Sequence, residues 1–224
     1  MTHYNITILN ISEHNLTTLP QDISSYTNLQ VLYCSYNQIN SLDNLLPTLK
    51  ELYCSSNQLT QLDNLPLTLT YLNCSDNNIT QLDNLPPTLK TLDCRHNNIT
   101  QLDNLPPRLE DLNCNNNKIT SLDNLPPTLQ ILTCNHNHIT QLDYLPITLK
   151  HLSCNSNQIT QLDNLPHALI CLLCYGNTIT HLDNLPHTLL TLGLVYLNHH
   201  PKNFNIQQSY GEDEGVYSLQ YIQS

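Results

Sequence analysis

The chain has 224 residues and draws on few kinds of large apolar side chain: Trp is absent, and Phe and Met occur once each. This narrow composition favours one small unit copied many times over a conventional globular core. A net charge of −11 argues against a nucleic-acid or anionic-membrane partner, because both need clustered cations. We therefore expect a protein partner, with a basic one favoured, and neither nucleic acid nor a membrane.

The N-terminal residues 1–28 differ from the rest of the chain. The first ten residues have no basic start and no apolar stretch, so they do not resemble a secretory signal, and a cytoplasmic location is expected. Ile6, Leu9 and Ile11 begin a first unit that lies 23 residues before the next copy and has His14 where later copies have Asn. We expect residues 1–28 to form an N-terminal cap coil, with a turn of helix near residues 21–26.

Residues 29–197 form a series of 20-residue repeats. One clear copy is residues 89–108, LKTLDCRHNNITQLDNLPPR, and positions are counted from its first Leu. Position 4 is Leu from Leu32 to Leu192 at every step of 20. Position 6 is Cys at 34, 54, 74, 94, 114, 134, 154 and 174, and position 9 is Asn at 37, 57, 77, 97, 117, 137, 157 and 177.

The order Leu-x-x-Leu-x-Cys-x-x-Asn-x-Ile resembles the consensus of the leucine-rich repeat over residues 6–197. The short repeat and its Leu-Pro-Pro segment resemble the bacterial effector-type subclass, and similar repeats occur in giant-virus proteins. The resemblance implies a β-rich solenoid, a leucine-rich-repeat horseshoe with a parallel concave sheet and an extended, polyproline-like convex side. It also implies a pathogen or viral protein that acts on host proteins in the host cytoplasm.

The residue pattern agrees with this fold. Leu and Cys at positions 4 and 6 alternate as a short strand requires, so the copies predict ten strands in one parallel sheet and almost no α-helix between Leu29 and Leu192. The position-9 Asn column predicts a ladder in which each amide bonds backbone groups of its own coil and the next. Proline at Leu85-Pro86-Pro87 favours extended backbone on the convex side.

The pattern decays at the C-terminal end, where Leu194 replaces Cys and Leu197 replaces Asn. Residues 198–224 do not repeat, and we expect them to form a tail or cap. Solenoid ends need a cover, and the apolar residues that could supply it are Val216, Tyr217, Leu219, Tyr221 and Ile222. The whole chain is predicted to be one structural domain.

Three residue columns could suggest metal or disulfide chemistry. The cysteines occupy the inward Leu position, so core packing is favoured over zinc or disulfides. The position-15 aspartates, from Asp43 to Asp183, are expected to accept backbone N–H bonds at a turn, with calcium bound between coils as the alternative. His167 and His187 occupy equivalent convex positions with no third ligand. The sequence thus predicts no metal and no cofactor.

Motifs of catalysis are missing: the sequence has no Gly-rich phosphate loop, His-Glu-x-x-His or Gly-x-Ser-x-Gly. We therefore expect a non-enzymatic protein-binding scaffold. The alternative is a structural or virion-associated repeat protein without a specific partner, in which surface variation would be neutral.

The concave face should present positions 3, 5, 7 and 8, which vary from copy to copy. We predict partner-binding residues there, with an aromatic group near the N-terminal end as the anchor. The predicted contact residues are Tyr33, Tyr36, Tyr53, Tyr71, Arg95, His96, His136 and His151. Other outward positions include Asp93, Asp111, Asn113, Asn116, Cys171, Leu173 and Tyr175.

Overall fold

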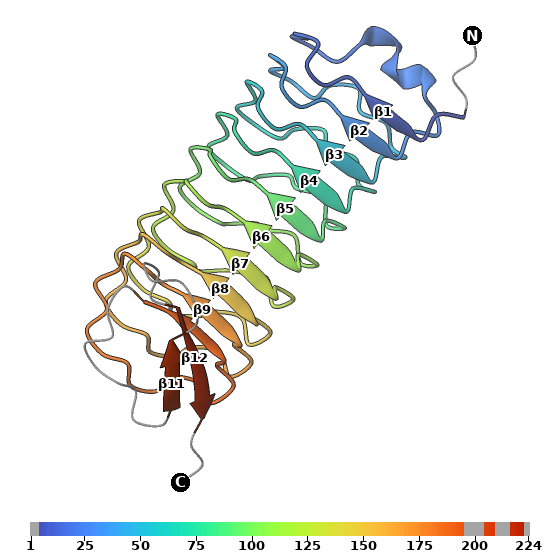
Figure 1. Ribbon diagram of the computed structural model, residues 1–224. Coiled ribbons are helices and arrows are strands. Elements are labelled where there is room, and N and C mark those ends of the chain that lie inside the picture. The colour runs from blue at the N-terminus through green and yellow to red at the C-terminus, as the bar shows by residue number, and fades with distance from the viewer. Residues whose placement is uncertain (1–4, 195–203, 209–215, 222–224) are drawn as a thin grey trace.

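The computed structural model describes residues 5–194 together with the backbone of residues 204–208 and 216–221. Ten short strands lie side by side along one flank of an elongated solenoid (Figure 1). They are β1 (Ile8–Asn10), β2 (Val31–Tyr33), β3 (Glu51–Tyr53), β4 (Tyr71–Asn73), β5 (Thr91–Asp93), β6 (Asp111–Asn113), β7 (Ile131–Thr133), β8 (His151–Ser153), β9 (Cys171–Leu173) and β10 (Thr191–Gly193).

The ten strands form one parallel sheet in chain order, as predicted. From β2 to β10, each residue pairs with the residue 20 positions later, for example Leu32 with Leu52. Equal repeat length therefore stacks every position of the repeat into a column across the sheet. Residues 29–194, all of which are described, contain no helix.

The core lies between the sheet and the return segments, which are the parts of each coil that lead from one strand to the next. The middle Leu of each strand from β2 to β10 is buried, at 0–1 % exposure. The column cysteines, for example Cys114, are unpaired and buried beside them. Burial raises the pKa of the Cys114 thiol to about 12, so this column packs as neutral apolar groups.

Two tight turns bend each return segment. In the fifth coil, Asn104 has a φ of +59°, which Asn tolerates better than most residues. In the turn at the coil's start, the Leu89 N–H donates to the Pro86 carbonyl at 3.0 Å. The Thr88 hydroxyl donates to the carbonyl of Leu69 in the coil before at 2.8 Å. Proline and threonine thus form the bend that turns the chain back into the sheet.

The position-9 asparagines form the predicted ladder inside the turn that follows each strand. The Asn77 amide N–H2 group donates to the carbonyls of Cys74 and Ser75 in its own coil and of Cys54 in the preceding coil, at 3.0–3.1 Å. Its Oδ1 accepts the Leu59 N–H at 2.9 Å. Each asparagine thus bonds its own coil and the preceding one, whereas the sequence predicted its own coil and the next.

The N-terminal coil contains the predicted helical turn, a 3-10 helix η1 (Gln21–Ser25) that buries Ile23. Asn37 ties this coil to the solenoid, since its Oδ1 accepts the N–H groups of His14 and Leu16. The ladder therefore reaches the N-terminal coil although that coil has no position-9 Asn of its own.

Two further strands extend the sheet at its other end, β11 (Phe204–Gln208) and β12 (Val216–Tyr221). β12 pairs antiparallel with β10, and β11 pairs antiparallel with β12. The backbone of β12 thus covers the edge of the parallel sheet. The side chains predicted to cover this end lie outside the described residues, and the boundaries at 28 and 197 stay predictions.

Candidate interaction surface

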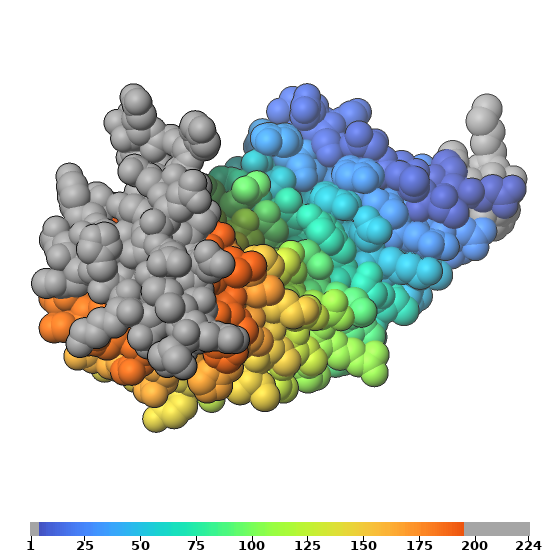
Figure 2. Space-filling model, turned by 60° about the horizontal axis from the view of Figure 1, so that its bottom comes forward, coloured from blue at the N-terminus to red at the C-terminus, as the bar shows by residue number. Residues whose placement is uncertain are grey.

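The solenoid has two long sides built from the same coils. The sheet face carries the outward side chains of the strands at positions 3 and 5 and of the turn that follows, and the return side carries positions 12–20. The space-filling view shows the coils packed as successive bands of colour along the molecule (Figure 2). A partner on either side would therefore meet residues from several coils.

Three tyrosines form a stack on the sheet face. The ring centroids of Tyr33 and Tyr53 lie 4.5 Å apart with an interplanar angle of 19°. Those of Tyr53 and Tyr71 lie 4.8 Å apart at 33°. Tyr33 and Tyr53 are partners in register, whereas Tyr71 pairs with Glu51 and reaches Tyr53 diagonally. The sheet register thus brings together three half-buried rings that the sequence separates by about 20 residues each.

Acidic groups surround the end of this stack. The Tyr53 hydroxyl donates to Glu51 Oε2 at 3.1 Å. Burial, followed by this hydrogen bond, raises the pKa of Tyr53 well above its usual range. Burial also raises the pKa of Tyr71, followed by the negative charges of Asp93, Glu51 and Asp111. The rings therefore stay neutral and lie in a negative field.

Tyr36 does not join the stack. It lies at position 8, in the turn after β2, with a φ of +56° and 63 % of its side chain exposed. Among the described residues it makes no ring contact. Position 8 has a positive φ in every coil from Tyr36 to Gly176. Its side chain therefore projects from the turn that follows the strand and not from the strand itself.

The four other predicted contact residues are spread along the sheet face and are not brought together. Arg95 lies in a turn, where its Nε is 3.5 Å from Asp93 Oδ2. His96 Nε2 is 3.4 Å from the Asn116 amide nitrogen. His136 and His151 are exposed, the first in a turn and the second on β8. Their role in binding stays a prediction.

Position 7 differs from the prediction, because it points outward only in some coils. Ser75 is buried, whereas Arg95 is exposed. In later coils the position holds a second asparagine ladder: Asn115 Oδ1 accepts the Asn135 N–H at 2.6 Å, and Asn135 Oδ1 accepts the Asn155 N–H at 2.6 Å. Position 7 is Ser, Arg, Asn or Tyr in the sequence. Only the run of three asparagines could have indicated this ladder.

The aspartate column on the return side also differs from the prediction. Among the described residues, the bonds to these carboxylates come from asparagine side chains of the following coil and not from backbone N–H groups. The Asn124 amide donates to Asp103 at 3.3 Å, and the Asn164 amide donates to Asp143 at 3.3 Å. In these coils, and more weakly at Asp83, where the Asn104 amide lies 3.5 Å away, the carboxylate accepts from the position-16 asparagine one coil later.

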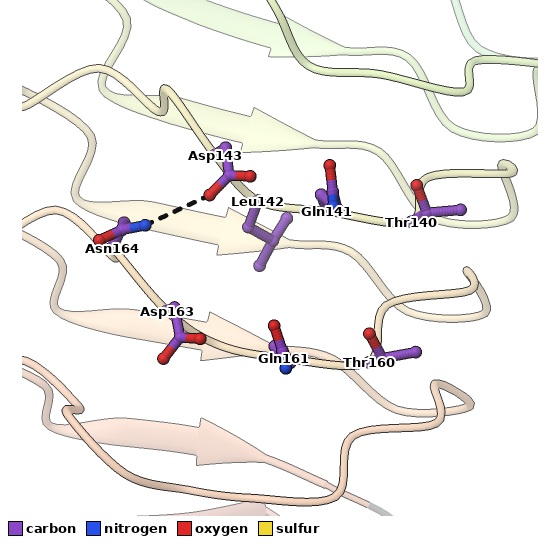
Figure 3. A pocket seen from close by; sticks show the side chains of 8 residues that line it. All are labelled: Thr140, Gln141, Leu142, Asp143, Thr160, Gln161, Asp163 and Asn164. Atoms are coloured by element: carbon purple, nitrogen blue, oxygen red, sulfur yellow. Dashed lines mark hydrogen bonds between the residues drawn. The ribbon is translucent and has the colours of Figure 1, made fainter.

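Small cavities lie between coils on the return side. The larger one, of about 170 Å³, is lined by residues of two successive coils (Figure 3), namely Thr140, Gln141, Leu142, Asp143, Thr160, Gln161, Asp163 and Asn164. A second cavity of about 120 Å³ is built from the same positions in earlier coils, at residues 100–103 and 120–124. Ligand sites usually enclose roughly 300–1,000 Å³. These cavities are a recurring feature of the repeat and not a specialised site.

Two exposed apolar residues of one coil interrupt the repeat on the return side. Tyr144 takes the position of Asn104, is 83 % exposed and has a φ of +62°. Ile147 takes the position of Pro107 and is 84 % exposed. Over residues 5–194 and the strand backbones beyond, no three His, Cys, Asp or Glu side chains are placed to hold a metal ion.

The architecture is that of a repeat solenoid with a parallel strand column, an inward cysteine column and an asparagine ladder. The family described as Leucine Rich repeats (2 copies) matches residues 27–67 and 87–127. The chain is a leucine-rich-repeat protein, and its structural neighbours include bacterial effector proteins with repeats of the same 20-residue type. No match was found among curated protein sequences.

Solved structures give closer comparisons. YopM from Yersinia enterocolitica WA-314 is 40 % identical over 73 % of this chain and 37 % of its own, with a TM-score of 0.69. The functional domain of InlJ from Listeria monocytogenes, which includes a cysteine ladder, is 31 % identical over 85 % of this chain and 50 % of its own, with a TM-score of 0.67. This chain therefore spans half or less of each of these two proteins.

A third structure shows the fold alone. TLR13, solved in complex with ssRNA13, is 22 % identical over 88 % of this chain and 34 % of its own, with a TM-score of 0.72. In the described part of the chain, no helix has the length and apolar character needed to cross a membrane. The resemblance to giant-virus proteins stays a prediction.

Proposed function

We propose that this chain is a non-enzymatic protein-binding scaffold that holds its partner on the sheet face. The observation that carries the proposal is the stack of Tyr33, Tyr53 and Tyr71, three half-buried rings on a surface open to a partner. A tyrosine ring can remain partly hydrated in the free protein and gain free energy when a partner buries it. Aromatic residues of this kind dominate the binding energy of protein interfaces.

Variation of the residue type from coil to coil also supports the sheet face as the binding surface. Position 3 carries eight different residue types in its first eight copies: Val31, Glu51, Tyr71, Thr91, Asp111, Ile131, His151 and Cys171. On the return side, position 15 is Asp in all eight copies. The sheet face therefore presents a different surface in each coil, which a specific partner requires and a uniform lattice does not.

The charge favours a basic protein partner, because the net charge of −11 attracts cations over several ångströms and repels a phosphate backbone. The neighbours among bacterial effectors favour a partner from a host cell, met in the host cytoplasm. Arg95, His96, His136 and His151 extend the proposed contact surface beyond the tyrosines.

Affinity capture with three versions of the full chain tests this proposal. The wild type is compared with Tyr33→Ala/Tyr53→Ala and with Tyr144→Ala/Ile147→Ala, which removes exposed apolar groups from the return side. We expect one set of proteins to be captured by the wild type and the return-side variant and lost with the sheet-face variant. Equal capture by all three versions would contradict the proposal and favour a structural or virion-associated protein without a specific partner.

A further inference from the structure

The tyrosine stack ends abruptly at Tyr71. The next residue in its column is Thr91, and the next in the column of Tyr53 is Asn73. No described ring therefore stacks on the far side of Tyr71. Two strands further along the sheet, the columns continue with carboxylates and not with rings.

The carboxylates of Asp93 and Asp111 repeat the geometry of the rings. Asp93 lies on β5 opposite Asn113, and Asp111 lies two residues before Asn113 on β6. The same diagonal step brings Tyr53 and Tyr71 together two strands earlier, in the pairing of β3 and β4. Strands in a sheet lie about 4.8 Å apart, so Asp93 lies one strand spacing and Asp111 two strand spacings from the strand of Tyr71.

The two carboxylates are not equally neutralised. The Asp93 side chain is 16 % exposed and faces Arg95 of its own coil at 3.5 Å. Asp111 is half-buried and has neither an ion pair nor a side-chain hydrogen bond within the described part of the chain. Burial raises the pKa of Asp111, and so does the charge of Asp93. A half-buried carboxylate without a cation is costly, and a cation supplied by a partner would lower that cost.

We propose that Tyr71, Asp93 and Asp111 form a receptor site for one arginine side chain of a protein partner. The proposal rests on the sheet face being the binding surface, and it names the chemistry of the contact. A planar guanidinium stacks on an aromatic face and pairs with carboxylates, so it would extend the tyrosine stack by one member and neutralise Asp111. Lysine could pair with the carboxylates, but its ammonium group offers no planar surface to the ring.

Surrounding side chains fit this occupant. Thr91 lies between Tyr71 and Asp111 in the same column, so a small polar side chain forms the floor of the site. Ile131 follows Asp111 and is 39 % exposed, which offers an apolar contact to the aliphatic part of the arginine side chain. Arg95 shows that a guanidinium can reach Asp93, and it leaves Asp111 unpaired.

Titration of N-acetyl-arginine amide into the ¹⁵N-labelled full chain at low ionic strength tests the site directly. We expect saturable chemical-shift changes at the backbone amides of Tyr71, Thr91 and Asp111. N-acetyl-citrulline amide has nearly the same shape without the charge, so it should bind at least about tenfold more weakly, a factor that corresponds to roughly 1.4 kcal/mol. N-acetyl-lysine amide should also bind more weakly than the arginine compound.

A matched pair of variants separates the site from general attraction to an acidic protein. Asp111→Asn and Asp123→Asn remove the same charge from the same coil, the first on the sheet face and the second on the exposed return side. We expect about tenfold weaker binding of N-acetyl-arginine amide for Asp111→Asn and a change of less than about twofold for Asp123→Asn. Tyr71→Phe keeps the ring and should retain binding, whereas Tyr71→Ala should weaken it.

Three results would overturn the inference: equal weakening by the two Asn variants, equal binding of the citrulline compound, or shifts centred on the return side. None of these three results depends on which protein the affinity capture identifies. If capture depends on Tyr33 and Tyr53 while the arginine compound fails to bind, the arginine site is wrong and the proposed function stands. If the arginine compound binds as expected but capture ignores the sheet face, the proposed function is wrong.

Discussion

The sheet face and the return side are built from the same coils but differ in which residues they allow. On the return side, position 16 is Asn in seven of eight copies, and position 15 is always Asp. Both are exposed in most coils, so burial does not explain their uniformity. Position 16 needs a residue that tolerates a positive φ, and in three coils its amide donates to the carboxylate of the preceding coil.

On the sheet face, position 3 only has to fit a strand between two neighbours, and many side chains do so. The comparison shows that exposure alone does not free a position to vary: a position varies when neither its backbone nor its hydrogen bonds depend on the side chain. Function can then use the variable positions. The tyrosine stack is the best sign that it does, because drift alone gives no reason for three rings to meet on successive strands.

Alkaline pH should have the largest effect on the free energy of unfolding, because it acts on the cysteine column in the core that both sides share. Burial raises the pKa of all eight column thiols, so they ionise in the unfolded chain first. Their stabilising contribution is complete below pH 9.0, the ordinary thiol pKa, and is lost as the pH rises toward about 12, the pKa of Cys114 in the fold. Each thiol should lower the free energy of unfolding by about 1.4 kcal/mol per pH unit in this window, and all eight together by roughly 11 kcal/mol per pH unit.

Urea denaturation at pH 8, 9 and 10 measures this dependence. Cys114→Ala should make the slope shallower by about 1.4 kcal/mol per pH unit. Cys171→Ser should change it less, because that side chain is only half-buried. A free energy of unfolding that does not fall between pH 8 and pH 10 would show that the column thiols are not buried.

The asparagine ladder joins successive coils and so stabilises both sides of the solenoid. Replacing one of its asparagines should have the next largest effect on the free energy of unfolding. Asn77→Leu leaves the buried Leu59 N–H without its acceptor and removes one donor from the carbonyls of three residues, which keep a second donor each. One unpaired buried N–H costs roughly 1–3 kcal/mol and each of the three lost hydrogen bonds about 0.5–1.5 kcal/mol, so we expect a loss of roughly 3 kcal/mol or more in the free energy of unfolding.

The neighbouring residue supplies the control for that rung. Asn78→Leu changes an exposed side chain that makes no hydrogen bond among the described residues, and it should shift the free energy of unfolding by less than about 0.5 kcal/mol. Asn115, which lies beside the ladder residue Asn117, would be an unsuitable control because its Oδ1 accepts the Asn135 N–H. Equal urea midpoints for the Asn77 and Asn78 variants would rule out the ladder as a source of stability.

On the sheet face, removing the rings of Tyr33 and Tyr53 should lower the free energy of unfolding less than replacing one ladder asparagine does. Tyr33→Ala/Tyr53→Ala loses two stacking contacts, each worth about 0.5–1.5 kcal/mol, while the core below stays filled. The double variant should therefore fold, with a loss of about 1–3 kcal/mol in urea denaturation. Tyr33→Phe/Tyr53→Phe keeps the rings and should remain close to wild type. An unfolded alanine variant would mean that the stack is structural and not a binding surface.

The smallest effect we expect is a gain on the return side. Tyr144→Asn restores the residue that tolerates a positive φ at this position, and its amide would be placed to donate to Asp123 as Asn124 does to Asp103. The free energy of unfolding should rise by about 1 kcal/mol. Tyr144→Ala, which regains neither feature, should not stabilise the chain. A destabilised Asn variant would show that Tyr144 makes a contact of its own.

The sequence predicted the parallel sheet, the cysteine core and the asparagine ladder because these features depend on strict periodicity. Each recurs at one position of a 20-residue repeat, and the repeat alone determines which residues become neighbours. Periodicity also placed Tyr33 and Tyr53 in one column. Periodicity predicted that Tyr71 shares this face, but not its ring contact with Tyr53, because the two residues occupy different positions of the repeat and meet diagonally across the register.

Features that depend on backbone angles or on one side chain reaching another could not be predicted in this way. The positive φ at Tyr36 directs that side chain away from the stack. The Asp103 carboxylate accepts from Asn124, whereas the sequence predicted backbone N–H donors at a turn. The second ladder at Asn115 and Asn135 was hidden because its position holds other residues in the earlier coils.

The most direct test of the sheet face as the functional surface is the dissociation constant of a captured partner for three forms of the chain. For Tyr33→Ala/Tyr53→Ala we predict a loss of at least about 2 kcal/mol of binding free energy, roughly 30-fold in the dissociation constant. For Tyr144→Ala/Ile147→Ala we predict a value within about twofold of wild type. The opposite pattern, with affinity lost in the return-side variant and retained in the folded sheet-face variant, would contradict the account.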